Sequence, residues 1–355
     1  MFTRAVLVIL VFSTQMFALL CFADTDAEVG FTIANQTPAA SEKMIASDLQ
    51  YPANIYQLDR FFAHHLLIVE KATHRLHLFR AGDSNEGFPS YLQSYVIATG
   101  QTSGDKSNSG DLKTPEGIYQ LINFLPNKEL LRQYGNDGKK YGIGAFVLDY
   151  PNLMDRKLGK TGGGIWLHST DDESRLLKGL DSKGCVVVGN QNLKDISQYI
   201  ELEHTPIIIV QDLFFLRKET WNNNREMIRL MIQDWLDAWK KENLDRYIGH
   251  YHYDFKDPIR GNFRSFRAYK QAVFQNPGRP VVDIDNLSIL AFGDYAVVNL
   301  RQIYKSNTID DIGRKTLYLK KNERYQWKII AEQWSSVKSG RSHGDEFTPS
   351  MRFFK

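Results

Sequence analysis

The chain has 355 residues, of which 43% are hydrophobic and 24% are charged. This composition excludes a disordered chain and supplies apolar side chains for about two globular domains. The formal net charge is only +3, which by itself indicates no particular partner. The charge is uneven, because residues 24–223 carry 20 basic and 25 acidic side chains, whereas residues 224–355 carry 23 and 16. We therefore expect the two halves to face different surroundings.

The first 23 residues have the layout of a secretory signal. A basic start precedes the apolar run 5–20, and small residues at Cys21 and Ala23 stand at the −3 and −1 positions of a cut before Asp24. The alternative is an uncleaved N-terminal anchor, although about 16 apolar residues are few for a membrane span. We predict that residues 1–23 are a signal peptide and that residues 24–59 form a polar linker or N-terminal arm.

Export makes the cysteine count informative. The chain has two cysteines, and removal of the signal leaves only Cys185. Thiols that persist in an oxidising compartment are usually paired. An unpaired one is either a buried small hydrophobe or a reactive nucleophile, and the count alone leaves both interpretations open.

Residues 60–215 are predicted to form a mainly β domain. Alternating apolar residues indicate a hairpin over 66–79 and a third strand at 91–99, followed by an exposed loop rich in Gly, Ser, Asp and Lys. Further elements are expected as short strands at 115–121, 146–149, 165–168 and 205–210, and as a short helix at 193–200.

Residues 222–338 are predicted to form a smaller α+β domain, and residues 339–355 a C-terminal tail. Apolar residues at helical spacing indicate an amphipathic helix over about 223–243. Two shorter helices are expected at 247–255 and 266–274, and four strands at 281–291, 295–304, 315–321 and 325–334. Helices followed by strands favour a compact α+β module. We interpret one aromatic stripe as core rather than as a ligand site: Trp235, Trp239, Tyr251 and Phe255.

Cys185 has the surroundings of a reachable nucleophile rather than of a core thiol. The flexible Ser-Lys-Gly segment precedes it and a β-branched run follows it, which indicates the mouth of a strand. Lys183 can favour the reactive thiolate. Gly184 lacks a Cβ and lets a substrate carbonyl approach the backbone, where the N–H of Cys185, together with that of Gly184, can hold an oxyanion.

A thiol nucleophile also needs a base, and His168 is the nearest candidate in the sequence. It ends a predicted strand, from which it can reach across to the sulfur. The carbonyl of Ser169 can orient its ring. Trp166 flanks the site, and we interpret it as packing more readily than as a substrate contact.

Four segments in order resemble the L,D-transpeptidase (YkuD-type) family over residues 65–212. His168 stands 17 positions before Cys185 of the Ser-Lys-Gly-Cys block, which is similar to the catalytic signature of that family. Lys113-Thr-Pro-Glu-Gly resembles its "KTPEG" turn, and the segments 146–152 and 205–209 resemble the stretch before the histidine and the closing strand. The second domain resembles an NTF2-like module. Together the two domains resemble two-domain cell-shape L,D-carboxypeptidases.

The resemblance implies a β-sandwich catalytic domain and a periplasmic enzyme acting on peptidoglycan. Cys185 would attack the carbonyl of the third residue of a tetrapeptide stem, form a thioester and release the terminal D-Ala, with His168 carrying the proton. Either water or the amine of a second stem would then resolve the thioester, and no metal or cofactor is implied. Two positions depart from the family pattern, because Lys183 replaces a histidine and Ser169 a glycine. The substitution at 183 leaves open which acceptor dominates.

A non-catalytic alternative is a wall-binding scaffold that recruits a homo-oligomeric or other protein partner through the NTF2-like domain. A catalytic pocket within that domain, with Asp254 or His252 as base, is a further alternative. His74 and His77 would point to opposite faces of a strand, and His250 and His252 lack a third ligand nearby, so we predict no metal site. Export also argues against a nucleic-acid partner for the basic residues of the second half.

Overall fold

The computed structural model describes residues 50–61, 63–82, 87–275, 280–307, 309–336 and 347–354. All of them belong to one compact unit, residues 38–355. The predicted signal peptide and most of the predicted arm lie outside the described residues. None of the described helices is both long and apolar enough to cross a membrane.

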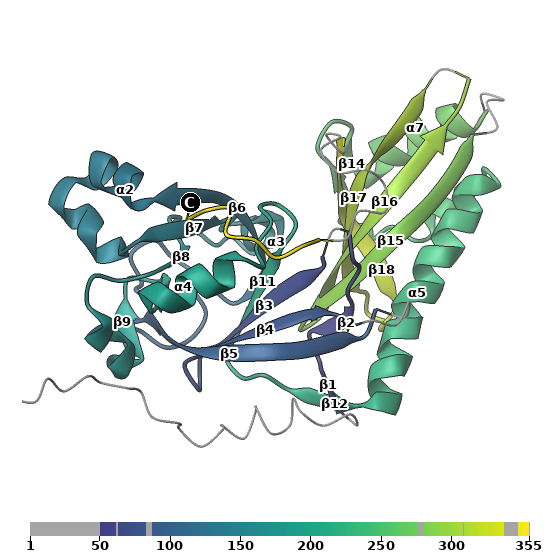
Figure 1. Ribbon diagram of the computed structural model, residues 1–355. Coiled ribbons are helices and arrows are strands. Elements are labelled where there is room, and N and C mark those ends of the chain that lie inside the picture. Colours follow the sequence, from purple (N-terminus) through teal and green to yellow (C-terminus); the bar gives the residue numbers. More distant parts are fainter. Residues whose placement is uncertain are drawn as a thin grey trace, which may run out of the picture. The chain divides into compact units, whose positions relative to one another are not determined.

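The first domain is mostly β, as predicted. Its strands are β3 (His65–Glu70), β4 (Arg75–Ala81), β5 (Pro89–Gly100), β6 (Gly117–Pro126), β7 (Gly144–Leu148), β8 (Trp166–His168), β9 (Leu180–Ser182), β10 (Val186–Val188) and β11 (Pro206–Val210). They form one sheet in the order β10-β8-β7-β6-β11-β3-β4-β5-β9, and β5 also pairs with β10. Because β5 pairs with β10 as well as with β4, the sheet closes on itself. The strands of this β domain occupy one half of the ribbon in Figure 1.

Short helices connect the strands of the first domain. They are α2 (Asn127–Tyr134), the 3₁₀ helix η1 (Gly135–Tyr141), α3 (Leu153–Lys157), the 3₁₀ helix η2 (Glu173–Lys178) and α4 (Asn190–Ser197). Only α4 overlaps a helix expected from the sequence. In α3 the Asn152 side chain accepts hydrogen bonds from the N–H groups of Met154 and Asp155, which caps the first turn.

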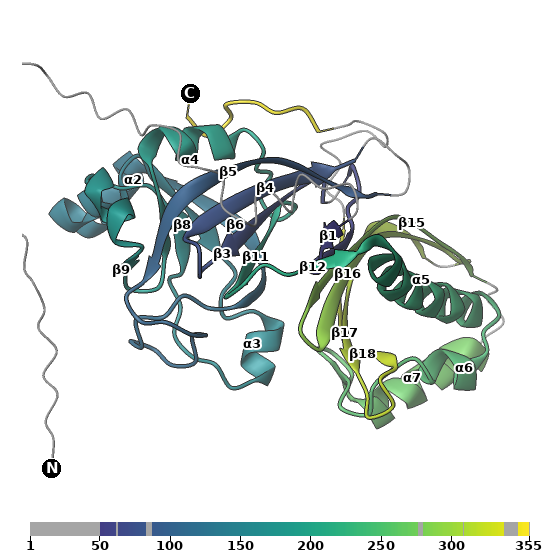
Figure 2. The same ribbon diagram turned by 90° about the horizontal axis from the view of Figure 1, so that it is seen from below.

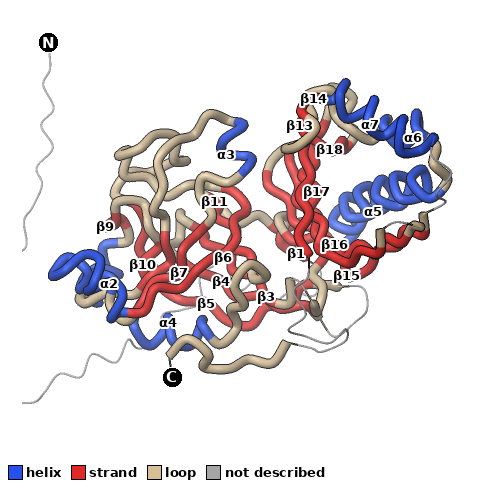
Figure 3. Tube along the Cα trace, turned by 90° about the horizontal axis from the view of Figure 1, so that it is seen from above, coloured by secondary structure: helices blue, strands red, loops and turns tan. Residues whose placement is uncertain are grey.

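The second domain is a smaller α+β unit, as predicted. Its helices are α5 (Lys218–Lys240), α6 (Leu244–Ile248) and α7 (Phe263–Gln275), and its strands are β13 (Lys256–Asp257), β14 (Gly261–Asn262), β15 (Val281–Phe292), β16 (Tyr295–Lys305), β17 (Asp310–Lys321) and β18 (Trp327–Ser336). Figure 3 shows α5, α6 and α7 on one side of the long strands. The predicted aromatic stripe is confirmed as core, because all four residues are buried in one cluster.

The helix expected at 247–255 is shorter than predicted. It corresponds to α6, which ends at Ile248. Beyond it the backbone pairs with β18: the His252 N–H donates to the Ile329 carbonyl at 2.8 Å, and the Ile329 N–H donates to the His250 carbonyl at 2.8 Å. These hydrogen bonds replace the helical ones, because each backbone group needs one partner.

The predicted arm is not only a linker, because it contains the strands β1 (Gln50–Pro52) and β2 (Ile55–Gln57). β1 pairs with β12 (Phe215–Arg217), which joins the two domains. β2 pairs with β15 and becomes the edge strand of the second domain's sheet. Ile55 is fully buried and its carbonyl accepts a hydrogen bond from the Trp221 indole at 2.7 Å, so a few apolar residues in a polar segment decide its pairing.

The described part of the predicted tail packs on the first domain. Phe353 and Phe354 contact Phe124, with ring centroids 5.0 and 5.2 Å apart. The Ser350 N–H donates to the Gln198 carbonyl at 3.2 Å, at the end of α4. Figure 2 shows this yellow C-terminal segment beside α4.

Candidate active site

Two neighbouring parallel strands carry the candidate nucleophile and base. Val187 of β10 is the register partner of His168 of β8. Cys185 precedes Val187 by two positions, so its side chain lies on the same face of the sheet as His168. Leu167, which precedes His168, and Val186, which follows Cys185, belong to the hydrophobic core. His168 and Cys185 therefore lie on the opposite face of these strands from the core residues Leu167 and Val186.

The His168 ring has a fixed orientation. Its Nδ1 lies 2.5 Å from the carbonyl oxygen of Ser169. A carbonyl only accepts hydrogen bonds, so Nδ1 carries the hydrogen and Nε2 presents a lone pair. The side chain is 2% exposed, and burial lowers the pKa of His168 to about 4. At neutral pH the ring is therefore an uncharged proton acceptor.

The Cys185 thiol is partly exposed but closely surrounded by protein. Its Sγ lies 3.5 Å from the carbonyl oxygen of Gly164, to which it donates. Burial raises the pKa of Cys185 to about 11, and a backbone hydrogen bond from Trp166 and the charges of Lys140, Arg175 and Lys106 oppose that effect. The thiol is thus neutral at pH 7, and its proton must leave during the attack.

Both groups line a pocket of about 170 Å³. Its other lining residues are Gln101, Lys140, Tyr141, Arg175, Asp181, Ser182 and Lys183. The Tyr141 ring stands edge-on to the His168 ring at 5.0 Å between centroids. A larger pocket of about 320 Å³ lies beside His64 and His65, but its lining contains no thiol or hydroxyl nucleophile other than Tyr199. We therefore take the smaller pocket as the candidate active site, because its lining contains both a thiol and a candidate base.

The loop before Cys185 is shaped by Ser182 and Gly184. The Ser182 hydroxyl donates to the Cys185 carbonyl at 2.6 Å and accepts from the Gly184 N–H at 3.0 Å. The Gly184 N–H is thus engaged within the loop, and of the two predicted oxyanion donors the N–H of Cys185 remains the candidate. Gly184 has a φ of 124°, and a Cβ at this position would lie 2.7 Å from the Lys113 carbonyl oxygen. Only glycine fits there.

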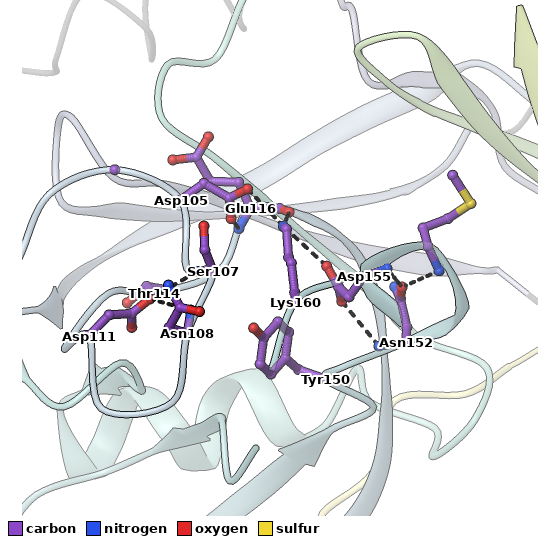
Figure 4. A network of polar contacts seen from close by, with 12 residues as sticks. Asp105, Ser107, Asn108, Asp111, Thr114, Glu116, Tyr150, Asn152, Asp155 and Lys160 are labelled. Atoms are coloured by element: carbon purple, nitrogen blue, oxygen red, sulfur yellow. Dashed lines mark hydrogen bonds and ion pairs between the residues drawn. The ribbon is translucent and has the colours of Figure 1, made fainter. Parts of the chain in front are cut away.

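The "KTPEG" segment contacts this loop through Lys113 and is itself held by bonds to the ends of β5 and β3. The Thr114 hydroxyl accepts from the Gly100 N–H at 2.8 Å, and Glu116 pairs with the buried Lys71 at 2.8 Å. Figure 4 shows Lys160 between Asp105 and Asp155, at 2.7 and 3.1 Å. The Lys160–Asp105 pair ties the loop 101–116 to the segment 150–164, whose last residue contacts the Cys185 sulfur.

The remaining predicted site residues occupy different positions around the pocket. Lys183 lines it but is exposed, and it is not among the main charges that act on Cys185. Trp166 is 8% exposed and packs against Tyr141 at 4.8 Å between ring centroids, which agrees with the packing interpretation. The Ser169 hydroxyl accepts from the Ile143 N–H at 2.8 Å, so its side chain joins a neighbouring loop.

Sequence reasoning missed the cations Lys140 and Arg175, and it missed Tyr141. They come from η1 and η2, two 3₁₀ helices with no apolar periodicity that could have indicated them. Ser182 was recognisable only as part of the motif.

The other histidines that the structure describes do not line this pocket. His77 is buried, with Nε2 at 3.3 Å from Glu70 Oε2, and His74 occupies a turn with a φ of 51°. His250 pairs with Asp234 at 2.7 Å. Among the residues that the structure describes, no three His, Cys, Asp or Glu side chains are grouped to hold a metal ion.

Comparison with known proteins identifies both domains. Residues 64–209 match the L,D-transpeptidase (YkuD) catalytic domain, and residues 227–333 match the Cds6 C-terminal NTF2-like domain. The chain therefore belongs to the L,D-transpeptidase family and carries a C-terminal NTF2-like domain. This family acts on peptidoglycan peptides, which implies a location at the cell wall.

Solved structures share the two-domain arrangement. The protein Bd1075 of Bdellovibrio bacteriovorus is 30% identical, with a TM-score of 0.70 and similarity over 82% of this chain and 99% of that one. A variant of the helical cell shape determining protein Pgp2 of Campylobacter jejuni is 25% identical, with a TM-score of 0.59 over 80% of this chain and 92% of that one. Among curated proteins, none matches this chain.

Proposed function

We propose that this chain is a periplasmic cysteine acyl-transfer enzyme that removes the terminal D-Ala from peptidoglycan tetrapeptide stems. Family membership supports the substrate class, and the similarity to a cell-shape protein supports a role in cell shape. We favour water over an amine as acceptor, which makes the enzyme chiefly an L,D-carboxypeptidase.

The reaction proceeds in two balanced steps. Cys185 Sγ bonds to the carbonyl carbon of the third stem residue while the thiol proton passes to His168 Nε2. The carbon–nitrogen bond then breaks, and the imidazolium returns that proton to the departing amine of D-Ala. Water next attacks the thioester, with His168 accepting its proton and returning it to the departing sulfur. The sum is tetrapeptide plus water giving tripeptide plus D-Ala.

One observation carries the proposal: the bond from His168 Nδ1 to the Ser169 carbonyl, which leaves Nε2 as the acceptor in the pocket that Cys185 lines. A neutral imidazole of fixed tautomer beside a neutral thiol can take the proton at the moment of attack. A protein that only binds stems does not require an oriented imidazole and a thiol in the same pocket.

The test is incubation of the purified protein with tetrapeptide muropeptides, followed by mass analysis for tripeptide and cross-linked dimer. Wild-type protein is expected to form tripeptide. Cys185→Ala is expected to form neither product, and His168→Gln is expected to lose at least about 100-fold in rate, the usual contribution of a general base.

His250→Gln is the matched control, because this histidine lies in the NTF2-like domain and bonds to Asp234. It should retain the wild-type rate, and all three variants should unfold cooperatively. Near wild-type turnover by Cys185→Ala would reject Cys185 as nucleophile. Binding of stems by an inactive wild-type protein would favour the scaffold alternative.

A further inference from the structure

The lining of the candidate active-site pocket carries an excess of positive charge. The cations are Lys140, Arg175 and Lys183, and the anion is Asp181. The two reacting groups add no charge at neutral pH, because burial sets the pKa of His168 at about 4 and that of Cys185 at about 11. Such a lining favours an anionic group on the bound substrate.

Arg175 is the one of these cations that the fold holds in place. Its side chain is 17% exposed, whereas Lys140 and Lys183 are exposed residues. Its Nε donates to Asp181 Oδ2 at 2.5 Å, and its Nη1 donates to the Thr170 hydroxyl at 3.2 Å and to the Lys140 carbonyl at 3.1 Å. Three bonds to three separate segments fix the plane of the guanidinium.

These bonds leave one nitrogen of the guanidinium available. An arginine has five N–H donors in a rigid fork, and the three bonds use Nε and Nη1. Within the described residues, Nη2 donates no hydrogen bond. The charge of Arg175 also acts on both reacting groups, since after burial it is among the causes that lower the pKa of His168 and oppose the raised pKa of Cys185. Arg175 lines the same pocket as these two groups, so a ligand bound there can meet the open donor.

The substrate has a matching group next to the bond that breaks. The residue that leaves a stem carries its free α-carboxylate and the departing nitrogen on the same carbon. A carboxylate at that position lies within one residue's length of the scissile carbonyl. The pocket volume of about 170 Å³ has room for one small residue rather than for an extended peptide.

We propose that Arg175 is a specificity-determining residue that binds the α-carboxylate of the leaving terminal residue through Nη2, an inference that rests on the proposed function. This contact restricts the enzyme to removal of a single residue from a free C terminus. A stem whose C terminus is amidated, extended by a further residue or joined as donor to the amine of another stem lacks a carboxylate at that position and leaves the guanidinium without its partner. The enzyme therefore acts only on stems whose terminal carboxylate is free.

The test compares kcat/KM for three synthetic stems: the tetrapeptide, the same tetrapeptide with a C-terminal carboxamide, and the pentapeptide. Wild-type protein is expected to favour the free tetrapeptide over the carboxamide by about 10- to 100-fold, the value of one charge-assisted hydrogen bond. In Arg175→Gln the preference should fall to within about threefold, because the rate on the free acid drops and the rate on the carboxamide does not. Arg175→Lys should keep part of the preference, since it retains the charge without the fork.

Lys178→Gln is the matched control. Lys178 also contacts Asp181, at 3.5 Å, and lies on the same 3₁₀ helix, but it is 62% exposed and is not a lining residue of the pocket. It should keep the wild-type preference. If Arg175→Gln slows all three substrates equally, Arg175 does not read the terminal carboxylate and the proposal is overturned. If wild-type protein turns over none of them, the proposed function fails instead, so the two failures are distinguishable.

Discussion

The reactivity of single residues in this site depends on burial more than on charge. Burial moves the pKa of Cys185 up to about 11 and that of His168 down to about 4, so the pair is neutral over the whole physiological range. A preformed thiolate–imidazolium pair requires the pKa of Cys185 to lie below that of His168. Proton transfer therefore accompanies the attack on the carbonyl, and the resting thiol is protected from adventitious alkylation.

The pH dependence of turnover follows from these pKa directions. His168 must be neutral to accept the proton, so activity is present above its folded-state pKa and is lost as pH falls through about 4. We expect kcat/KM on the tetrapeptide to stay nearly constant from pH 7 to pH 5. Alkylation of Cys185 should accelerate about tenfold per pH unit from 7 to 9, because only the thiolate reacts. An acid limb centred near pH 6.5, or an alkylation plateau at neutral pH, would contradict the neutral pair.

Lys183 is the residue at which the choice of acceptor can be tested. Its ammonium group lines the pocket, where it would repel an incoming amine that is still protonated, whereas water carries no charge. We expect Lys183→His to raise the ratio of cross-linked dimer to tripeptide when tetrapeptide stems serve as donor and acceptor. Lys178→His, at a more remote exposed position, is the control and should leave the ratio unchanged. An unchanged ratio in Lys183→His would show that this side chain does not select the acceptor.

The sequence was sufficient to propose Cys185 and His168, because the only cysteine outside the predicted signal peptide and a motif spacing are local properties of the chain. It was not sufficient for Arg175 and Lys140. Their places depend on the 3₁₀ helices η2 and η1, which are polar segments without periodicity. The engagement of the Gly184 N–H by Ser182 was equally inaccessible, since it depends on one side-chain rotamer.

At the scale of elements, the loop from β9 to β10, which carries the cysteine block, packs against the "KTPEG" motif far away in the chain. Gly184 approaches the Lys113 carbonyl so closely that no Cβ fits, so the "KTPEG" turn and the cysteine block are in direct contact. Most strands of this domain were predictable from alternating or continuous apolar residues, whereas the three-residue strand β9 was not. The close approach of the two loops was not, because it is a tertiary contact.

Substitution of Gly184 by alanine tests this contact. The positive φ of 124° and a Cβ 2.7 Å from a backbone oxygen both oppose the change. We expect Gly184→Ala to lower the free energy of unfolding by about 1–3 kcal/mol and to abolish most turnover, because the loop that carries Cys185 must move. Urea unfolding and the muropeptide assay measure the two effects. The control is Gly159→Ala, whose φ is 74° but whose Cβ would meet nothing within 4 Å, so turnover should persist. Equal turnover in both variants would show that the contact with Lys113 is dispensable.

At the scale of the whole molecule, each domain contacts a segment that lies, in the sequence, on the far side of the other domain. The strand β2 precedes the catalytic domain in sequence but pairs with β15 of the NTF2-like domain. The segment 347–354 follows the NTF2-like domain but packs on the catalytic domain. The hydroxyl of Tyr295 further accepts a hydrogen bond from the Ile118 N–H, 3.1 Å away, which connects β16 to β6. Composition had suggested a loose arm and a tail, because a few apolar residues in a polar stretch carry no periodic signal.

The C-terminal segment should therefore stabilise the catalytic domain. Phe353 packs against both Phe124 and Phe146, at 5.0 Å from each ring centroid, and Phe354 adds an edge contact to Phe124. Because both rings are only partly buried, we expect the double substitution Phe353→Ala and Phe354→Ala to lower the free energy of unfolding by about 2–4 kcal/mol, below the cost of two fully buried rings. Calorimetry should show the catalytic domain melting earlier. Phe214→Ala is the control, since that ring is 68% exposed and its loss should cost less than about 0.5 kcal/mol. If the double variant melts like this control, the segment only lies against the catalytic domain and contributes nothing to the stability of that domain.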